Sequence, residues 1–108
     1  MKETFREYIH KLRTKDRMTL TKLAAALDLD QSTLSKIENG KRNVPAEILP
    51  KLASTFCLDI KELEQEYFSE EIAKIIYSYD EPKTVLKLAE EKAKYFKSKS
   101  IKQGETKI

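Results

Sequence analysis

Two short helical patterns separated by only three residues are the feature that most limits how this chain can fold. The first pattern runs from Leu20 to Leu27 after Thr19, a residue type that caps helices. The second runs from Gln31 to Asn39 after Asp30, another capping residue. The link between them is DLD, residues 28–30. So short a link forces two helices to meet at a steep angle, which is the geometry of a helix-turn-helix.

Apolar residues at helical spacing continue on both sides of this pair. The chain has 108 residues and only two glycines, so runs of helix formers are barely interrupted and strand-type turns are scarce. The spacing predicts five helices that complete a small core, over residues 3–15, 20–27, 31–39, 46–56 and 59–68. We therefore expect an all-α fold: a five-helix domain over residues 1–68, a two-helix extension over residues 69–97, which restarts after Pro82, and a flexible Lys-rich tail over residues 98–108.

The residue types present argue against an enzyme. The single Cys57 and single His10 exclude an intramolecular disulfide and a structural zinc site. The sequence contains no nucleophile motif, Gly-rich phosphate loop or metal-ligand cluster, so we expect no catalytic residue, metal or cofactor. We expect Cys57 to be a buried, unreactive thiol rather than a redox sensor, and His10 to be solvated or to face a phosphate.

The sequence gives no sign of a membrane segment. No apolar run approaches 18 residues, and the N-terminal MKETFREYIHKLR lacks the apolar stretch of a signal peptide. A cytoplasmic location is therefore expected, with no membrane partner.

Basic residues are concentrated in the first half of the chain. Residues 1–45 contain ten Lys and Arg against six Asp and Glu, whereas residues 46–68 contain two against five. The net charges of these segments are thus +4 and −3, and the whole chain carries +3. This distribution suggests an anionic partner for the first half.

The helix expected over residues 31–39 has an unusual polar surface of an amide, hydroxyls and an ammonium near its N-terminus. Such groups reach base edges in a DNA major groove, where Gln pairs with adenine, Lys with guanine, and Ser or Thr with several groups. The side chains expected to contact bases are Gln31, Ser32, Thr33, Ser35 and Lys36. Nearby, Lys22, Lys41 and Arg42 are expected to border the DNA backbone and bind phosphate. Each cation alone is more simply a solvated side chain, but their joint placement favours DNA.

These residues belong to a longer stretch that resembles the helix-turn-helix domain of the lambda-repressor-like family, also called the Cro and XRE family. Residues 20–63 carry the likeness with LTKLAAALDLDQSTLSKIENGKRNVPAEILPKLASTFCLDIKEL, and STLSKIENGKR is the most specific segment. The likeness extends over roughly residues 5–66. It implies a sequence-specific, bacterial or phage DNA-binding regulator associated with the nucleoid.

Carried over by position, the resemblance implies that Gln31, Ser32 and Lys36 read bases, and that Arg13 forms a structural ion pair with Glu38. The family commonly begins its second helix with a Gln that contacts the DNA backbone. Leu20 occupies that position, so the contact is absent or is made by Thr19, Thr21 or Lys22. Two glycines common in the family are Asp28 and Cys57 here, which weakens the helix-ending signals but not the reading surface.

One recognition helix covers only a few base pairs, so we expect a homodimer on an inverted-repeat operator. The apolar residues expected at the dimer contact are Leu63, Tyr67, Phe68, Ile72, Ile75, Ile76, Tyr79, Val85, Leu86, Ala89 and Phe96. Alternatively, the extension only packs against itself and the first domain.

Two other functions are compatible with the same sequence. The extension of an antitoxin would bind a toxin, and a protein-interaction module would keep the helix-turn-helix shape without binding DNA. The extension also resembles that of small regulators encoded with restriction-modification systems. A transcription regulator of this kind is expected to contact double-stranded DNA and another copy of itself, with a toxin or RNA polymerase as further partners.

Overall fold

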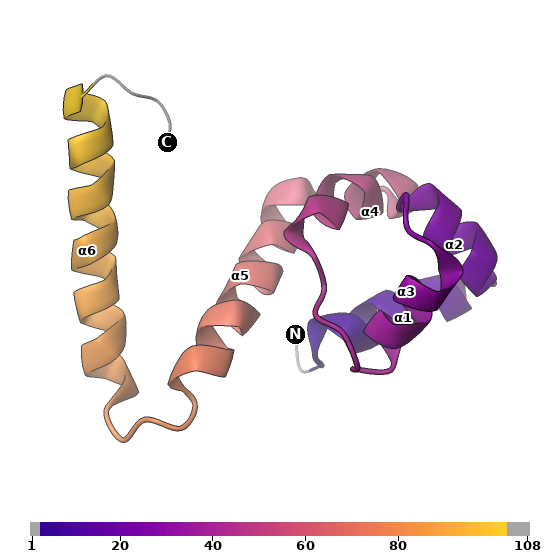
Figure 1. Cartoon of the computed structure of the whole chain (residues 1–108), viewed down its shortest axis with the longest axis horizontal. Coiled ribbons are helices and arrows are strands. Elements are labelled where there is room, and N and C mark those ends of the chain that lie inside the picture. Colours follow the sequence, from indigo (N-terminus) through magenta and orange to yellow (C-terminus); the bar gives the residue numbers. More distant parts are fainter. Residues whose placement is uncertain (1–2, 104–108) are drawn as a thin grey trace. The chain divides into compact units, whose positions relative to one another are not determined.

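The structure, a computed structural model, describes residues 3–103, and all the regular elements in that range are helices. In chain order they are α1 (Phe5–Lys15), α2 (Leu20–Ala26), α3 (Gln31–Glu38), the 3-10 turn η1 (Ala46–Ile48), α4 (Leu49–Phe56), α5 (Ile60–Ile76) and α6 (Pro82–Gln103) (Figure 1). The predicted all-α class is confirmed. The chain divides into two compact units, the first ending at Ile72 and the second beginning at Ala73.

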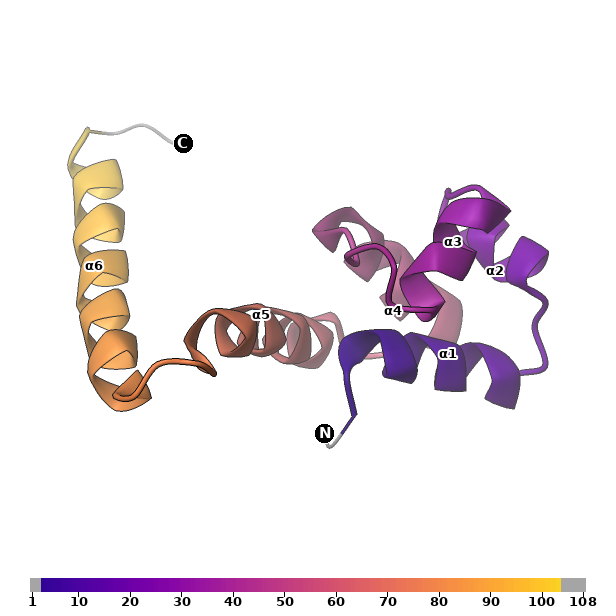
Figure 2. The ribbon, with the colours of Figure 1, turned by 60° about the horizontal axis from the view of Figure 1, so that its bottom comes forward.

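The α2–α3 pair forms as its capping residues predict. The Thr19 hydroxyl accepts a hydrogen bond from the Lys22 amide at 3.1 Å, and the Asp30 carboxylate accepts one from the Thr33 amide at 2.8 Å. Asp28 takes a left-handed backbone conformation, with φ of 62°, which lets the chain turn directly after α2. The two helices contact each other, and α1 contacts α3 (Figure 2).

One hydrophobic core lies within the first unit. It contains Phe5, Ile9, Leu23, Ala24, Leu27, Leu34, Ile37, Ile48, Leu49, Leu52, Ala53, Leu63 and Tyr67. Leu63 and Tyr67 were expected at a dimer contact, and that prediction is wrong because both side chains are less than 10% exposed, at 4% and 7%. The Tyr67 ring packs edge-on against Phe5 with 5.4 Å between ring centroids, and its hydroxyl donates to the Val44 carbonyl at 2.7 Å.

The fourth and fifth helices differ from the expected ranges in informative ways. Pro50 lies in the first turn of α4, and the preceding residues form the 3-10 turn, so the regular helix begins at Leu49 rather than Ala46. Helix α5 continues through Ser69, where a new helix was expected to begin. The Ser69 hydroxyl donates to the Glu66 carbonyl at 3.1 Å, a bond that serines make inside a helix. The expected two-helix extension is therefore the end of α5 followed by α6.

Two further sequence expectations are wrong. Cys57 is exposed rather than buried, because it ends α4 in the left-handed conformation, with φ of 55°. The Lys-rich segment is helical through Gln103, so α6 includes the first part of the expected flexible tail, and residues 104–108 lie outside the described residues. Lysine is a good helix former, and α6 continues as a regular helix across residues 98–103.

A buried acidic group joins α3 to α1. The Glu38 side chain is only 5% exposed, and Arg13 donates to both of its carboxylate oxygens, from Nε at 2.8 Å and from Nη2 at 2.9 Å. This is the ion pair that the family resemblance implies. The His10 Nδ1 lies 2.7 Å from Glu38 Oε1, and since an ionised carboxylate only accepts, Nδ1 carries a proton and donates. A third bond from Arg13 Nη1 to the Met18 carbonyl fixes the guanidinium.

These contacts keep the Glu38 carboxyl ionised. Burial, the largest single influence, raises its pKa, but the hydrogen bonds from Arg13 and His10 and the positive charge of Arg13 together lower the pKa below the ordinary value of 4.5. The stability that Glu38 contributes is therefore fully present above pH 4.5 and is lost as the pH falls through the lowered folded value.

Replacing Arg13 with Ala is expected to lower the free energy of unfolding by about 3 to 5 kcal/mol, because the buried Glu38 carboxylate is left without its main partner. We expect burial then to outweigh the remaining hydrogen bond from His10, so that the pKa of Glu38 rises above its ordinary value. The variant should therefore regain part of the lost stability as the pH is lowered toward 4.5, opposite to the wild type. Urea unfolding of both proteins at several pH values measures both effects.

The Lys51–Asp28 ion pair offers a matched control. Its nitrogen and oxygen are 3.2 Å apart, but the two side chains are 49% and 84% exposed. Lys51→Ala should therefore cost less than about 1 kcal/mol. Similar losses for the Lys51 and Arg13 variants would contradict a special role for the buried pair.

Candidate nucleic-acid interface

One side of α3 is polar and exposed, and the other is buried in the core. Leu34, Ile37 and Glu38 fall on the buried side. Gln31, Ser32, Ser35 and Lys36 fall on the opposite arc at helical spacing, and of these Ser35 alone is half-buried. Thr33, the remaining predicted base contact, is half-buried at the edge of this arc. The five predicted side chains are thus gathered on one short helix, four of them on one face.

Gln31 and Ser32 are oriented by hydrogen bonds before any ligand is present. The Thr21 hydroxyl donates to Gln31 Oε1, which joins the two helices of the pair. The Ser32 hydroxyl donates to Asp30 Oδ1 at 3.1 Å. Ser32 therefore presents lone pairs outward, whereas the Gln31 amide nitrogen keeps two N–H donors and its carbonyl oxygen keeps a second lone pair.

Asn39 belongs to the same polar face, although the sequence marked it only as the end of the helix. It is exposed, and its amide nitrogen donates to the Ser35 hydroxyl at 3.4 Å. It lies eight positions after Gln31 in the sequence, which places both on the same side of the helix axis. The helix expected over residues 31–39 already includes Asn39, so the helical spacing from Gln31 would have placed its amide with the other polar side chains.

The five residues predicted to bind phosphate are all exposed. They are Thr19, Thr21, Lys22, Lys41 and Arg42. Thr19 and Lys22 lie at the start of α2, where the threonine is also the cap. Lys41 and Arg42 follow α3 directly in the chain. Hydrogen bonds from Thr33 and Ser32, and then the positive charge of Arg42, lower the pKa of Asp30, so the helix cap is an ionised carboxylate.

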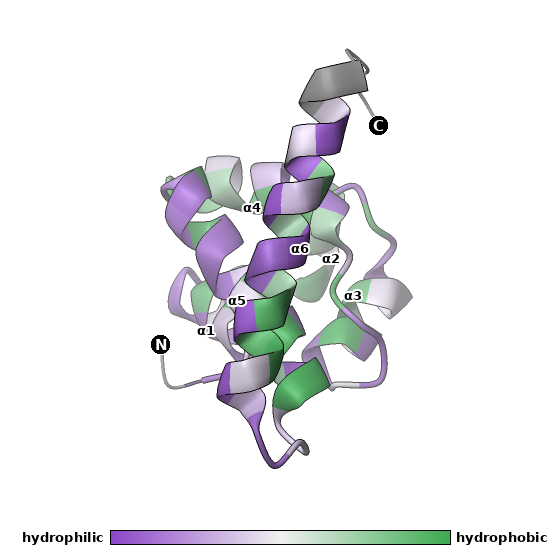
Figure 3. Ribbon diagram, turned by 90° about the vertical axis from the view of Figure 1, so that its left-hand side faces the viewer, coloured by the Kyte–Doolittle hydropathy of each residue, from purple (hydrophilic) through white to green (hydrophobic). Residues whose placement is uncertain are grey.

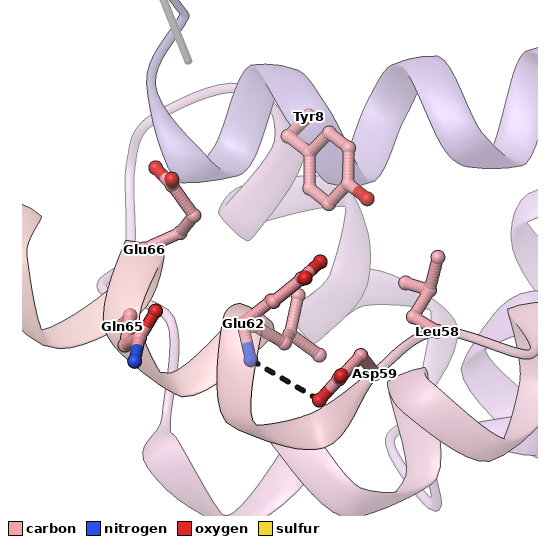
Figure 4. Close-up of a pocket in the computed structure, with 7 residues that line it drawn as sticks. Tyr8, Leu58, Asp59, Glu62, Gln65 and Glu66 are labelled. Carbon is pink, nitrogen blue, oxygen red and sulfur yellow. Dashed lines mark hydrogen bonds between the residues drawn. The ribbon is translucent and has the colours of Figure 1, made fainter.

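A second surface, a shallow hollow between α1 and α5, has the opposite charge (Figure 4). It is lined by Tyr8, Leu58, Asp59, Glu62, Leu63, Gln65 and Glu66. Partial burial and then the negative charges of Glu3, Glu66 and Glu62 raise the pKa of the Tyr8 hydroxyl. Such a surface repels a phosphate backbone, so it is not suited to nucleic acid.

Metal sites and membrane-spanning helices are absent from the part of the chain that the structure describes. No group of three or more His, Cys, Asp or Glu side chains within residues 3–103 could hold a metal ion. No helix in the same range is long and apolar enough to cross a membrane.

Comparison with known proteins finds a family that part of the chain resembles. A family model described as helix-turn-helix matches residues 9–63, which include all of α2, α3 and α4 and the start of α5. Neither a curated protein nor a solved structure shows a significant match to the chain. The match covers 55 of 108 residues, and it confirms the resemblance drawn from the sequence. The chain therefore belongs to the Cro/C1-type helix-turn-helix family of DNA-binding regulators.

Proposed function

We propose that the protein is a sequence-specific transcriptional regulator that binds an inverted-repeat operator as a homodimer. Helix α3 enters the major groove, with Gln31, Ser32, Ser35 and Lys36 at the bases and Thr33 at the edge of the contact. Thr19, Thr21, Lys22, Lys41 and Arg42 bind the flanking phosphates.

The observation that carries this proposal is the division of α3 into a buried and a polar side. The helix is only eight residues long, yet Leu34, Ile37 and Glu38 fix it to the core. Its outward side chains are short or end in hydrogen-bonding groups, so the backbone of the helix can approach the floor of a groove. A protein-interaction module that does not bind DNA has no need for such a face.

The Ser32 and Gln31 hydrogen bonds support specific roles at the bases. Ser32 uses its hydroxyl proton on Asp30, so it favours a base that donates, such as cytosine N4 or adenine N6. Gln31 can donate to adenine N7 from its amide nitrogen and accept from adenine N6 with the lone pair that Thr21 does not use.

An apolar stripe on α5 supports the homodimer. Leu63 and Tyr67 face the core, and Ile72, nine residues after Leu63, lies on the opposite side of the same helix. Phe68, Ile72 and Ile75 are 50%, 45% and 64% exposed and are spaced by four and three residues, the spacing of helices that pack against a partner helix. Water-exposed apolar stripes of this length are uncommon on monomers.

Helix α6 carries the same spacing. Leu86, Ala89, Ala93 and Phe96 follow one another at intervals of three, four and three residues, and each is exposed. The hydrophobic residues of α6 are concentrated in its first half (Figure 3). Of the other predicted contacts, Ile76 and Val85 are half-buried and Tyr79 is 54% exposed. We propose that a second copy of the chain packs against both apolar stripes.

Lys36→Ala and Lys41→Ala are expected to affect DNA binding in different ways. Loss of Lys36 should relax the preference at one base pair of each half-site, by about 1 to 3 kcal/mol. Loss of Lys41 should weaken binding to all duplexes alike and reduce the slope of log K against log[salt] by about 0.9. Binding isotherms on sets of duplexes at several salt concentrations distinguish the two results.

Lys61→Ala is the matched control, because Lys61 is also an exposed lysine and lies at the start of α5, away from α3 in the sequence. It should leave both affinity and base preference unchanged. If the Lys36 and Lys61 variants kept the same base preference as the wild type, Lys36 would not read a base.

Ile75→Asp is expected to separate the dimer, because a charge on the apolar stripe of α5 would be buried without a partner. The chain has a mass of 12.6 kDa, so light scattering should give twice that value for the wild type and 12.6 kDa for the variant.

Tyr77→Asp is the control, because Tyr77 is 84% exposed and lies outside the four-three spacing of the stripe. It should remain a dimer. A monomeric wild type would contradict the homodimer, and a wild type that purifies in a complex with a second protein would favour the antitoxin instead.

A further inference from the structure

The C-terminal end of α3 has all of its last backbone carbonyls bound. The Ser35 carbonyl accepts from the Asn39 amide at 3.0 Å. The Lys36 carbonyl accepts from the Lys41 amide at 2.8 Å, and the Ile37 carbonyl accepts from the Gly40 amide at 3.1 Å. The last two bonds form a Schellman motif, in which the chain reverses just after the helix. One carbonyl, that of Glu38, has no backbone donor within this motif.

Arg6 of α1 supplies the missing donor. Its Nη1 donates to the Glu38 carbonyl at 3.0 Å, across 32 residues of sequence. A guanidinium at the C-terminal end of a helix also stabilises the negative end of the helix dipole. Arg6 therefore binds the backbone of Glu38, whereas Arg13 and His10 bind its carboxylate.

The same guanidinium lies against the turn that follows. Gly40 has φ of +76°, a conformation that favours glycine, and a Cβ added there would lie 2.9 Å from Arg6 Nε and 3.2 Å from Arg6 Cζ. The turn and the arginine are therefore in close contact, and any larger residue at position 40 would displace one of them.

The base of the Arg6 side chain is itself held in place. The preceding Phe5 is 2% exposed in the core, and its amide donates to Glu70 Oε1 at 2.8 Å. Thr4 and Glu7 cap the helix reciprocally, with Glu7 accepting from the Thr4 amide at 2.8 Å. Arg6 thus projects from a fixed first turn of α1 onto the end of α3.

We propose that Arg6 is a positioning residue for DNA binding: it holds the turn at Gly40 so that Lys41 and Arg42 are directed at the DNA backbone. This inference rests on the proposed phosphate contacts of those two residues. Without Arg6, the turn can move relative to α1, and ordering it on DNA would then cost conformational entropy that the wild type does not lose.

A double-mutant cycle tests the proposal. Arg6→Ala is compared with the wild type, and the triple variant Arg6→Ala, Lys41→Ala, Arg42→Ala is compared with Lys41→Ala, Arg42→Ala. Affinity for one duplex is measured at several salt concentrations, on protein shown by circular dichroism to be folded. We expect Arg6→Ala to weaken binding about tenfold in the wild type and less than about twofold in the background that lacks both cations.

The salt dependence separates positioning from a direct phosphate contact by Arg6. If Arg6 acts only through the turn, its removal leaves the slope of log K against log[salt] unchanged in the Lys41→Ala, Arg42→Ala background. A direct contact would reduce that slope by about 0.9 and would give the same loss of affinity in both backgrounds. Either result would overturn the proposal.

Lys11→Ala controls for the loss of one positive charge from α1. Lys11 is 63% exposed and lies 3.6 Å from Glu3, and we expect its removal to leave affinity unchanged. An equal loss for the Lys11 and Arg6 variants would overturn the positioning role, as would wild-type affinity for Arg6→Ala. If the wild type bound no duplex DNA at all, the proposed function itself would fail, which is a different outcome.

Discussion

The buried Glu38 carboxylate is the contact on which the position of α3 depends. A short helix has few apolar residues with which to fix itself, and α3 buries only Leu34 and Ile37 besides Glu38. Arg13 donates to both oxygens of this carboxylate, and His10 donates to one of them. These bonds stabilise the attachment and also fix its direction, because a planar guanidinium binds both oxygens in only one orientation of the carboxylate. The orientation of the polar face of α3 follows from this attachment.

The attachment leaves the rest of α3 available for function. Core packing and the ion pair use one side of the helix and the caps use its ends, so the outward side chains take no part in the buried core. Three acidic side chains, Asp59, Glu62 and Glu66, line the hollow between α1 and α5. A local group of acids of this kind disfavours the approach of a polyanion on that side.

Local features of this protein could be predicted from the sequence, whereas most contacts between distant residues could not. The caps Thr19 and Asp30 were predictable because each acts on its own neighbours. The partners of Glu38 from α1 are 25 to 32 residues away; the family resemblance supplied Arg13, but nothing in the spacing marked His10 or Arg6. The predicted helix start at Ser69 was wrong because serine is common both before helices and inside them. The predicted burial of Cys57 was wrong because its left-handed backbone conformation overrode the preference of cysteine for burial.

Selection of binding sites from random duplex DNA tests the central claim most directly, since sequence, symmetry and spacing are read together. We predict that the full chain enriches an inverted repeat whose half-site centres lie about 34 to 36 Å apart, or a multiple of that distance, on one face of the duplex. The Lys36→Ala variant should enrich the same spacing with one base pair of each half-site relaxed. Enrichment of no motif would contradict sequence-specific binding by α3.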